Sequence, residues 1–457
     1  MGKHARRRQP NRIAARAATT AGALAVVIGA GAIPANAATK AATARPDTDP
    51  AKGGDLQHDG GGPDATLSQM QNDLPTLPQK SSGSTTMSPR ALTAPTKVTL
   101  PAPIGKYPVG TVSLHLRDTS RPDPYVSGTT YRDLMVQVWY PAAATTGYGN
   151  SPWLATNAAN SFLSRQGLNS SQVSLPTTAG HTGAPVLTSA GKLPVIFYST
   201  GLRSDRSLGT TLVQDMASRG YIVVMVDHTH DANEVQFPNG SLQKGALPSV
   251  IHASDILAVR SADISFTLNE LTAITKGTNP TVEKSALPTG LSTTMDMSKV
   301  GIFGWSLGGA EAGTAMYNDS RIKAGFNLDG TFYGTVASKG LGKRPFMLMS
   351  AQSHNLSTDS SWRSFWAATT GTKYDVRVAG TKHLSFSDNE YLLPQEASRL
   401  GMSTTQLQSE LGTISQTRAV TVERAYLAAF FGSQFKGEKW SILNGPSSSY
   451  PEVSFVS

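Results

Sequence analysis

The clearest chemical signal in this 457-residue chain is the run Gly304-Trp305-Ser306-Leu307-Gly308, which follows the pattern G-x-S-x-G. An apolar run, residues 300–303, precedes the motif, and a helix-compatible run, residues 307–317, follows it. A turn this tight between a strand and a helix strains the serine and leaves no space for large neighbours. The pattern therefore predicts that Ser306 is a nucleophile at the start of a helix, whose dipole favours developing negative charge.

A serine nucleophile needs a base, and the base needs an acid that orients it. Two histidines follow Ser306 in the chain, His354 and His383. We predict that His383 is the base, because it follows the last predicted strand, where this arrangement carries its histidine. His354 comes one strand earlier, and we interpret it as a residue of the surface or of the pocket edge.

The acid is less sharply defined, because four aspartates downstream are candidates: Asp329, Asp359, Asp375 and Asp388. Asp329 ends an apolar, strand-like run and precedes a glycine, so its carboxylate is expected at the same sheet edge as the nucleophile. Asp359 follows the next strand, which is the commoner position for the acid in sheets of this kind. The pattern favours Asp329 and leaves Asp359 open.

The oxyanion that forms during attack needs two N–H donors. The amide of Leu307, directly after the nucleophile, is expected to be one of them. The second is expected from the loop at residues 199–203, which follows a predicted strand and contains Gly201. Because glycine permits close approach of the backbone, we assign the amide of Leu202 as the second donor.

The elements that must position these residues alternate between strands and helices. Apolar runs predict strands at residues 111–116, 133–140, 193–198, 221–226, 300–303, 322–328, 345–349 and 374–378. Helices are predicted at residues 207–219, 254–271, 307–317 and 420–431, and residues 142–190 are interpreted as an irregular, partly helical excursion. This alternation predicts an α/β protein of the α/β-hydrolase fold, with a mostly parallel central sheet and helices on both faces.

Three segments of different composition divide the chain. Residues 1–37 combine six basic residues, an apolar run and the sequence Ala35-Asn36-Ala37, which predicts a signal peptide cleaved near Ala37 and a secreted protein. Residues 38–97 lack apolar periodicity and are predicted to be a disordered linker. Residues 98–457 are predicted to form one catalytic domain, without a transmembrane segment in the mature protein.

Composition and motifs exclude several classes of function. The net charge of +9 comes mostly from the first 37 residues, and the remainder has 34 basic against 31 acidic side chains, so no nucleic-acid partner is expected. The chain has no cysteine, which excludes disulfides and thiolate chemistry. Residues 227–231 contain two histidines but no matching third ligand, so no metal is expected. Phosphate- and dinucleotide-binding motifs are absent, and no cofactor is expected.

Taken together, these residues resemble the platelet-activating factor acetylhydrolase family, in a secreted bacterial form. The resemblance covers most of residues 100–455 and rests on residues 138–141, 201–202, 217–223, 227–228, 304–308, 327–330 and 382–386, with Arg260, Asp263 and Leu268. Such proteins carry their acid one strand earlier than usual, which implies Asp329. Two positions depart from the family pattern, because Thr200 and Trp305 stand where histidines are usual.

The resemblance implies a serine carboxylic-ester hydrolase that acts through an acyl-enzyme on short-acyl phospholipids or related lipid esters, with transient contact to a lipid surface. Trp305, Phe332 and Tyr333 are expected to bind substrate, because they lie next to Ser306 or Asp329 in the chain. The aromatic residues at 362, 365 and 366 have helical spacing and are expected to pack in the core or at its rim. A lipase or polyester hydrolase, an acyltransferase and a non-catalytic lipid-binding protein remain alternatives.

Overall fold

The computed structural model describes residues 65–72, 94–128 and 131–456. These residues belong to one compact unit, Lys52–Ser457. The predicted signal peptide, residues 1–37, and most of the predicted linker lie outside the described residues. Within the described ranges, every helix is too short or too polar to cross a lipid bilayer.

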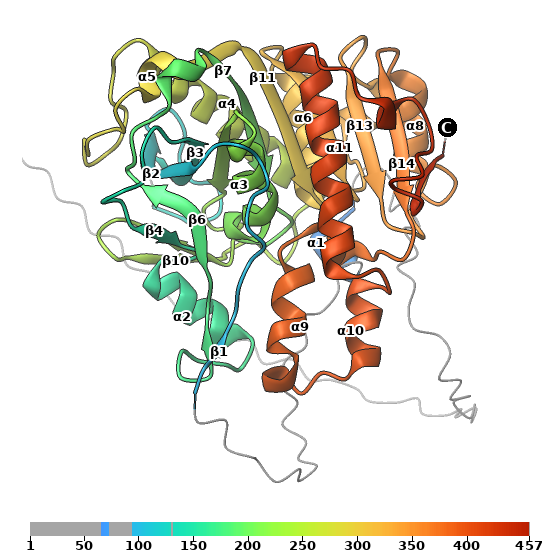
Figure 1. The fold of residues 1–457 in the computed structure, drawn as a ribbon, viewed down its shortest axis with the longest axis horizontal. Coiled ribbons are helices and arrows are strands. Elements are labelled where there is room, and N and C mark those ends of the chain that lie inside the picture. Colours follow the sequence, from blue (N-terminus) through green and yellow to red (C-terminus); the bar gives the residue numbers. More distant parts are fainter. Residues whose placement is uncertain (1–64, 73–93, 129–130, 457) are drawn as a thin grey trace, which may run out of the picture. The chain divides into compact units, whose positions relative to one another are not determined.

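A mixed sheet of eleven strands forms the centre of the described part (Figure 1). Its six middle strands are parallel, and antiparallel pairs flank them on both sides. The predicted, mostly parallel central sheet is therefore confirmed. In spatial order the strands are β15 (Val453–Phe455), β14 (Lys373–Val378), β13 (Phe346–Ser350), β12 (Ile322–Leu328), β11 (Met295–Trp305), β7 (Leu193–Ser199), β8 (Ile222–Asp227), β3 (Arg132–Pro141), β2 (Val109–Asp118), β6 (Thr177–Thr182) and β4 (Asn150–Pro152).

Helices cover both faces of the sheet, because its middle strands are buried on both sides. Alternate residues of β7 point into different cores: Ile196 and Tyr198 into one, Val195 and Phe197 into the other. The first core includes apolar residues of α3 (Thr210–Ser218), α9 (Asn389–Leu400), α10 (Thr404–Leu411) and α11 (Gln416–Lys436). The second includes residues of α4 (Ala253–Thr275), α6 (Leu307–Asn318), α7 (Thr335–Lys339) and α8 (Ser360–Ala368). This arrangement confirms the predicted α/β-hydrolase fold.

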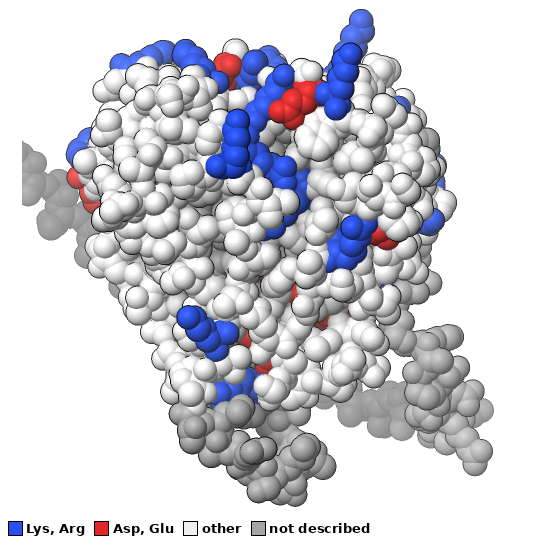
Figure 2. Space-filling model, in the orientation of Figure 1, with Lys and Arg blue, Asp and Glu red and all other residues white. Residues whose placement is uncertain are grey.

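The face that α3 and α11 cover is the one turned toward the viewer in Figures 1 and 2. Lys and Arg lie on this face in several groups, mainly in the upper half, and broad areas without charged residues separate them (Figure 2). Smaller elements complete the described part: α1 (Leu67–Asn72), α2 (Thr156–Arg165), α5 (Leu291–Thr294), β1 (Thr96–Lys97), β5 (Val173–Ser174), β9 (Glu234–Gln236) and β10 (Leu242–Lys244).

The sequence does not predict α9, and two of the segments that it does describe differ from the expectation. Residues 142–190 contain a helix, α2, as predicted, but they are not irregular otherwise, because β4 and β6 extend the central sheet beyond β2. Part of the predicted linker is folded, because α1 buries Leu67 and Met70 and the Leu67 amide donates a hydrogen bond to the Ile251 carbonyl at 2.8 Å. Two apolar residues within six positions are too few to show a helical period in the sequence.

Candidate active site

Ser306 occupies the turn between β11 and α6, in a conformation that few side chains adopt. Its φ of 58° and ψ of −128° lie outside the common regions for L-residues. A Cβ atom on Gly304 would lie 2.3 Å from the Gly308 carbonyl oxygen, and one on Gly308 would lie 2.1 Å from the Ser199 carbonyl oxygen. The two glycines of the motif are therefore needed for space, as the pattern predicted.

Three parallel strands bring the predicted nucleophile, base and acid to the same edge of the sheet. Ser306 follows β11, Asp329 follows β12, and His383 lies after β14. The Nε2 atom of His383 is 2.9 Å from the Oγ atom of Ser306, and its Nδ1 atom is 2.7 Å from an Oδ atom of Asp329. One ring nitrogen can thus accept the serine proton while the other donates to the carboxylate.

The carboxylate of Asp329 is fully buried and accepts hydrogen bonds through both oxygens. Its Oδ1 atom is 2.8 Å from the Ala351 amide and 2.8 Å from Nδ1 of His354, while Oδ2 contacts His383. Burial by itself raises the pKa of Asp329, but the charge of His354 and the hydrogen bonds from both histidines outweigh it and hold the pKa well below its usual value. The acid therefore stays ionised.

His354 is not at the surface or at a pocket edge, so that prediction is wrong. Its side chain is fully buried, because the loop after β13 turns inward and places the ring between two carboxylates. The Nε2 atom lies 2.9 Å from Asp359, the aspartate that the sequence left open as an alternative acid. Asp359 also accepts hydrogen bonds from the Ser361 and Trp362 amides, so it caps the N-terminus of α8.

The loop after β7 lies directly beside Ser306. A Cβ atom on Gly201 would lie 2.8 Å from the Trp305 ring and 3.3 Å from the Cβ atom of Ser306. The guanidinium of Arg260, from α4, donates to the carbonyl of Thr200 at 2.6 Å and to the carbonyl of Gly201 at 3.0 Å. These bonds hold the carbonyls of the loop toward the protein interior, which orients the backbone that carries the predicted Leu202 donor.

A buried ionic network holds Arg260 in turn. The Asp231 carboxylate is 2.6 Å from Nε of Arg260, and Glu311 of α6 is 3.4 Å from its Nη1. Further along the network, His228 lies 3.0 Å from Asp263 and 3.2 Å from Glu311. The acids of loop 227–231 and its surroundings therefore pair with cations of the chain itself. In the described part of the chain, no group of three His, Cys, Asp or Glu side chains is arranged to hold a metal ion.

The three residues predicted to bind substrate have different surroundings. Trp305 is buried, and its indole donates to the His383 carbonyl at 2.9 Å, so it stabilises the loop that carries His383. Phe332 is 1% exposed and its ring stacks on Phe365 with centroids 4.3 Å apart, so it packs in the second core, and its contact with substrate stays a prediction. Tyr333 is partly buried at the edge of the same core, and its contact with substrate stays a prediction.

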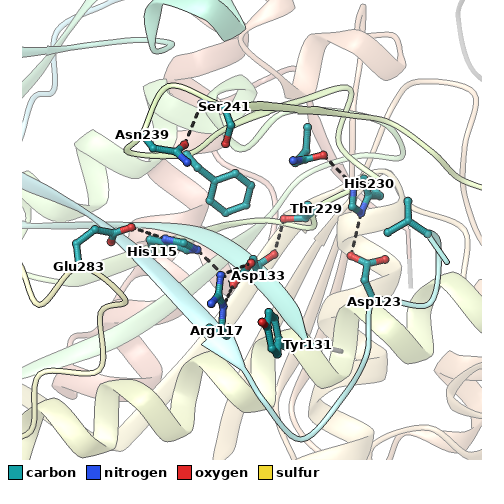
Figure 3. Close-up of a pocket in the computed structure, with 13 residues that line it drawn as sticks. His115, Arg117, Asp123, Tyr131, Asp133, Thr229, His230, Asn239, Ser241 and Glu283 are labelled. Atoms are coloured by element: carbon teal, nitrogen blue, oxygen red, sulfur yellow. Dashed lines mark hydrogen bonds and ion pairs between the residues drawn. The ribbon is translucent and has the colours of Figure 1, made fainter. Parts of the chain in front are cut away.

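A polar cavity of about 340 Å³ lies at the same edge of the sheet, beside β2 and β3 (Figure 3). His115 lines it, with Nδ1 2.7 Å from Glu283 and Nε2 3.3 Å from Asp133. In the order of the sheet, β7, β8 and β3 separate β2 from β11, a distance of roughly 19 Å at the usual strand spacing. The part of the cavity that β2 and β3 line is therefore far from Ser306, while Thr229 and His230, which also line it, follow β8, two strands from β11.

Comparison with known proteins finds esterases among the proteins that are similar to this chain. Residues 92–430 match the family described as platelet-activating factor acetylhydrolase, isoform II. A probable 1-alkyl-2-acetylglycerophosphocholine esterase of Arthroderma benhamiae is 29% identical over 278 residues, which is 58% of this chain and 66% of that protein. A platelet-activating factor acetylhydrolase of Cavia porcellus is 26% identical over 263 residues, 50% of this chain and 55% of that protein.

A solved structure of a ferulic acid esterase from Streptomyces cinnamoneus superposes with a TM-score of 0.68 at 31% identity. It covers 79% of this chain and 99% of the esterase. The match to the two curated relatives is less extensive, because it spans less than two thirds of either protein's own length.

Proposed function

The chain belongs to the platelet-activating factor acetylhydrolase isoform II family, and from that premise we propose that it is a serine carboxylic-ester hydrolase. The observation that carries the proposal is the contact of His383 with both Ser306, at 2.9 Å, and Asp329, at 2.7 Å. A hydroxyl, an imidazole and a buried carboxylate at these distances fit nucleophilic attack on an acyl carbon.

In the first half of the proposed reaction, the Oγ atom of Ser306 attacks the ester carbonyl while Nε2 of His383 takes its proton. Asp329 stabilises the imidazolium that forms and fixes its tautomer. The amides of Leu202 and Leu307 donate to the oxyanion, with the loop of Leu202 held by Arg260 from behind. The tetrahedral intermediate collapses when His383 gives the proton to the leaving alcohol, and an acyl-enzyme on Ser306 remains.

In the second half, a water molecule attacks the acyl-enzyme. His383 removes a proton from this water, the same two amides stabilise the second oxyanion, and the acid leaves as Ser306 recovers its proton. Each proton moves through one ring nitrogen, so no redox or group-carrying cofactor enters the steps. The Trp305 indole, bonded to the His383 carbonyl, limits movement of the base between the two halves.

We propose short-acyl phospholipids or related lipid esters as substrates, and secretion as the route by which the enzyme meets them. The names of the two curated relatives support an acetyl ester of a glycerophosphocholine. The basic, apolar and small-residue segments of residues 1–37 support export with cleavage near Ala37. Contact with a lipid surface would then be transient, since the proposed mature protein has no predicted membrane span.

A second candidate is an ester of an aromatic acid. The ferulic acid esterase that this chain resembles is covered over 99% of its length, more completely than either curated relative. This observation favours an acyl pocket that accepts a cinnamic acid. The leaving alcohol would differ from a glycerophospholipid, while the steps at Ser306 and His383 would be the same.

Turnover of p-nitrophenyl acetate by the wild type and by Ser306→Ala tests the proposal. We expect the variant to lose activity by at least about 10⁴-fold while keeping its melting temperature. The matched control is Ser320→Ala, because Ser320 is an exposed serine before β12, at the opposite end of that strand from Asp329. Equal activity of wild type and Ser306→Ala would refute the proposal, and an inactive wild type would favour the non-catalytic alternative.

A substrate series then separates the two candidates. The wild type is assayed with a 1-alkyl-2-acetylglycerophosphocholine, with p-nitrophenyl esters of increasing acyl length and with methyl ferulate. We expect kcat/KM to fall as the acyl chain lengthens and to be higher for the phospholipid than for methyl ferulate. The reverse order would favour the aromatic ester. Product analysis with added alcohol identifies transfer to that alcohol instead of hydrolysis.

A further inference from the structure

A second histidine lies behind the acid of the proposed triad. His354 contacts Asp329 through Nδ1 at 2.8 Å and Asp359 through Nε2 at 2.9 Å. The chain of contacts therefore runs from Ser306 through His383 and Asp329 to His354 and Asp359. All five side chains are buried, and the last three have no exposed surface.

The chemistry of these contacts requires His354 to be a cation. An ionised carboxylate only accepts hydrogen bonds, so each ring nitrogen that faces one must carry a proton. Asp359 is kept ionised by four further donors: the Ser361 amide at 2.7 Å, the Ser361 hydroxyl at 2.6 Å, the Thr331 hydroxyl at 2.9 Å and the Trp362 amide at 3.1 Å. Asp329 accepts from the Ala351 amide as well. Both carboxylates are thus anionic, and the ring between them is doubly protonated.

The balance of charges around His354 supports the same state. Burial lowers the pKa of His354, but the two carboxylates outweigh it and raise the pKa to about 9. Asp375, on the neighbouring strand β14, also faces His354, and its pKa is raised by burial to about 6. The Trp362 ring lies against the imidazole with centroids 4.2 Å apart and excludes water from one side. His354 is connected to the proposed base, His383, through Asp329, which contacts both histidines.

We propose that His354, held as a cation between Asp329 and Asp359, is a positioning residue that fixes the acid of the triad and sets the pH at which His383 becomes a free base. The inference rests on the proposed function, because it concerns the base of that reaction. Without the cation, Asp329 and Asp359 would together place a charge of −2 behind His383. With the cation, the net charge of the three groups is −1. Two charges would stabilise the imidazolium of His383, and the base would stay protonated to a higher pH.

The experiment is the pH profile of kcat/KM for p-nitrophenyl acetate, measured on the full chain for wild type and His354→Gln. The acidic limb of this profile reports the base of the free enzyme. We expect its midpoint to move up by roughly one pH unit in the variant. A variant with lower activity at every pH and an unchanged midpoint would overturn the proposal, because it would assign His354 a merely structural role.

The double variant His354→Gln/Asp359→Asn gives a sharper test. It removes one positive and one negative charge together, so the net charge behind His383 returns to that of the wild type. We expect the midpoint of the acidic limb to return to within about 0.3 pH units of the wild-type value. A midpoint that stays with the single variant would contradict the electrostatic part of the proposal.

His115→Gln is the matched control, because it removes a buried histidine that also lies between two carboxylates (Figure 3). Its neighbours Asp133, on β3, and Glu283, in the segment between α4 and α5, line the cavity, whereas the hydrogen bonds of Asp329 go to Ala351, His354 and His383. We expect this variant to keep the wild-type midpoint. An equal shift in both single variants would show a general effect of lost charge and would overturn the specific role of His354.

A measurement on the wild type covers the case in which His354→Gln does not fold. With ¹⁵N-labelled histidine, we expect the His354 ring to show two protonated nitrogens at pH 8. A neutral His354 at pH 8 would overturn the proposal. Failure of the proposed function is distinguishable, because it appears as an inactive wild type or an active Ser306→Ala, and neither result depends on position 354.

Discussion

Two regions of the molecule place a buried histidine between two carboxylates, and they differ in what surrounds the pair. His354 lies among β12, β13 and α8, where Asp329 and Asp359 have no exposed side-chain surface. His115 lies on β2 beside a cavity, and its partners Asp133 and Glu283 keep 26% and 36% of their side-chain surface exposed (Figure 3). An imidazole and two carboxylates are thus fully buried in one region, whereas the two carboxylates are partly exposed in the other.

This difference shows in which region the charge of a histidine affects the groups of the proposed reaction. Water screens the carboxylates that pair with His115. The charge of His115 therefore acts over a short range and does not affect the groups that we place in the reaction. The carboxylates of His354 are screened only by protein, and one of them is the acid bonded to His383. The comparison predicts large effects on chemistry from changes in the first region and small effects on stability from changes in the second.

The largest expected effect separates the two regions by activity. Asp329→Asn leaves the shape of the side chain but removes the charge that fixes the tautomer of His383, and we expect kcat to fall by about 10⁴-fold. Asp133→Asn makes the same chemical change beside His115, and we expect kcat within about threefold of wild type. Steady-state kinetics with p-nitrophenyl acetate measures both. A similar loss of kcat in the two variants would contradict the difference that we expect between the two regions.

The pH dependence of stability gives the next effect. The folded-state pKa of His354, about 9, lies above the unfolded value of 6.5, so the ion pairs contribute fully below pH 6.5 and are lost as the pH rises to 9. We expect the free energy of unfolding of wild type relative to His354→Gln to decline by about 3 kcal/mol between pH 6.5 and pH 9.5. Urea denaturation at several pH values measures it.

The corresponding decline for His115→Gln should be smaller. Burial lowers the pKa of His115, but hydrogen bonds with Asp133 and Glu283 outweigh it and raise the pKa overall. Its contribution therefore also falls with increasing pH, but the partners are partly exposed and solvent weakens the pairing. A decline as steep as that of His354→Gln would contradict the role that we give to solvation.

An aromatic ring packs on each histidine, which allows a third comparison. Trp362 is fully buried, lies 4.2 Å from the His354 ring and donates its indole N–H to the Gly330 carbonyl at 2.7 Å. We expect Trp362→Phe to lower the free energy of unfolding by about 2 kcal/mol, because it loses both this bond and packed volume. Phe237 lies edge-on to His115 at 4.7 Å, and Phe237→Leu should cost about 1 kcal/mol.

The smallest effect is expected at the rim of the cavity. Arg117 pairs with Asp133 at 2.7 Å, but about a third of its side chain is exposed. We expect Arg117→Gln to change the free energy of unfolding by less than about 1 kcal/mol, and the change should shrink further in high salt. Thermal unfolding at low and high ionic strength checks this. A larger change that salt does not reduce would show that the pair behaves as a buried one.

The sequence was sufficient for the parts of the site that steric rules dictate. Gly304 and Gly308 are needed because a Cβ atom at either position would overlap backbone atoms, and this requirement is visible in the motif itself. The end of an apolar strand located Asp329 for a similar reason, since parallel strands end at a common edge. The order of strands and helices was likewise readable from their apolar patterns.

The remaining features of the site depend on the conformation of loops, which the spacing of residues in the sequence does not predict. The loop after β12 directs Phe332 into the core against Phe365, although Phe332 lies only three positions from Asp329. The loop after β13 buries His354, and no pattern of apolar residues marks it. The sequence did not predict α9, because Glu390 and Glu396 interrupt the apolar face of this helix. Both side chains are buried, which raises their pKa values to about 8 and about 7.

Covalent labelling of the nucleophile tests the central claim most directly. The full chain is treated with an alkyl fluorophosphonate, and the modified residue is identified by intact mass and peptide mapping. We predict a single adduct on Ser306 in the wild type, none in Ser306→Ala, and much slower labelling in Asp329→Asn, whose base is wrongly oriented. Labelling of another residue, or an equal rate in wild type and Ser306→Ala, would contradict the assignment of Ser306, His383 and Asp329 as one catalytic unit.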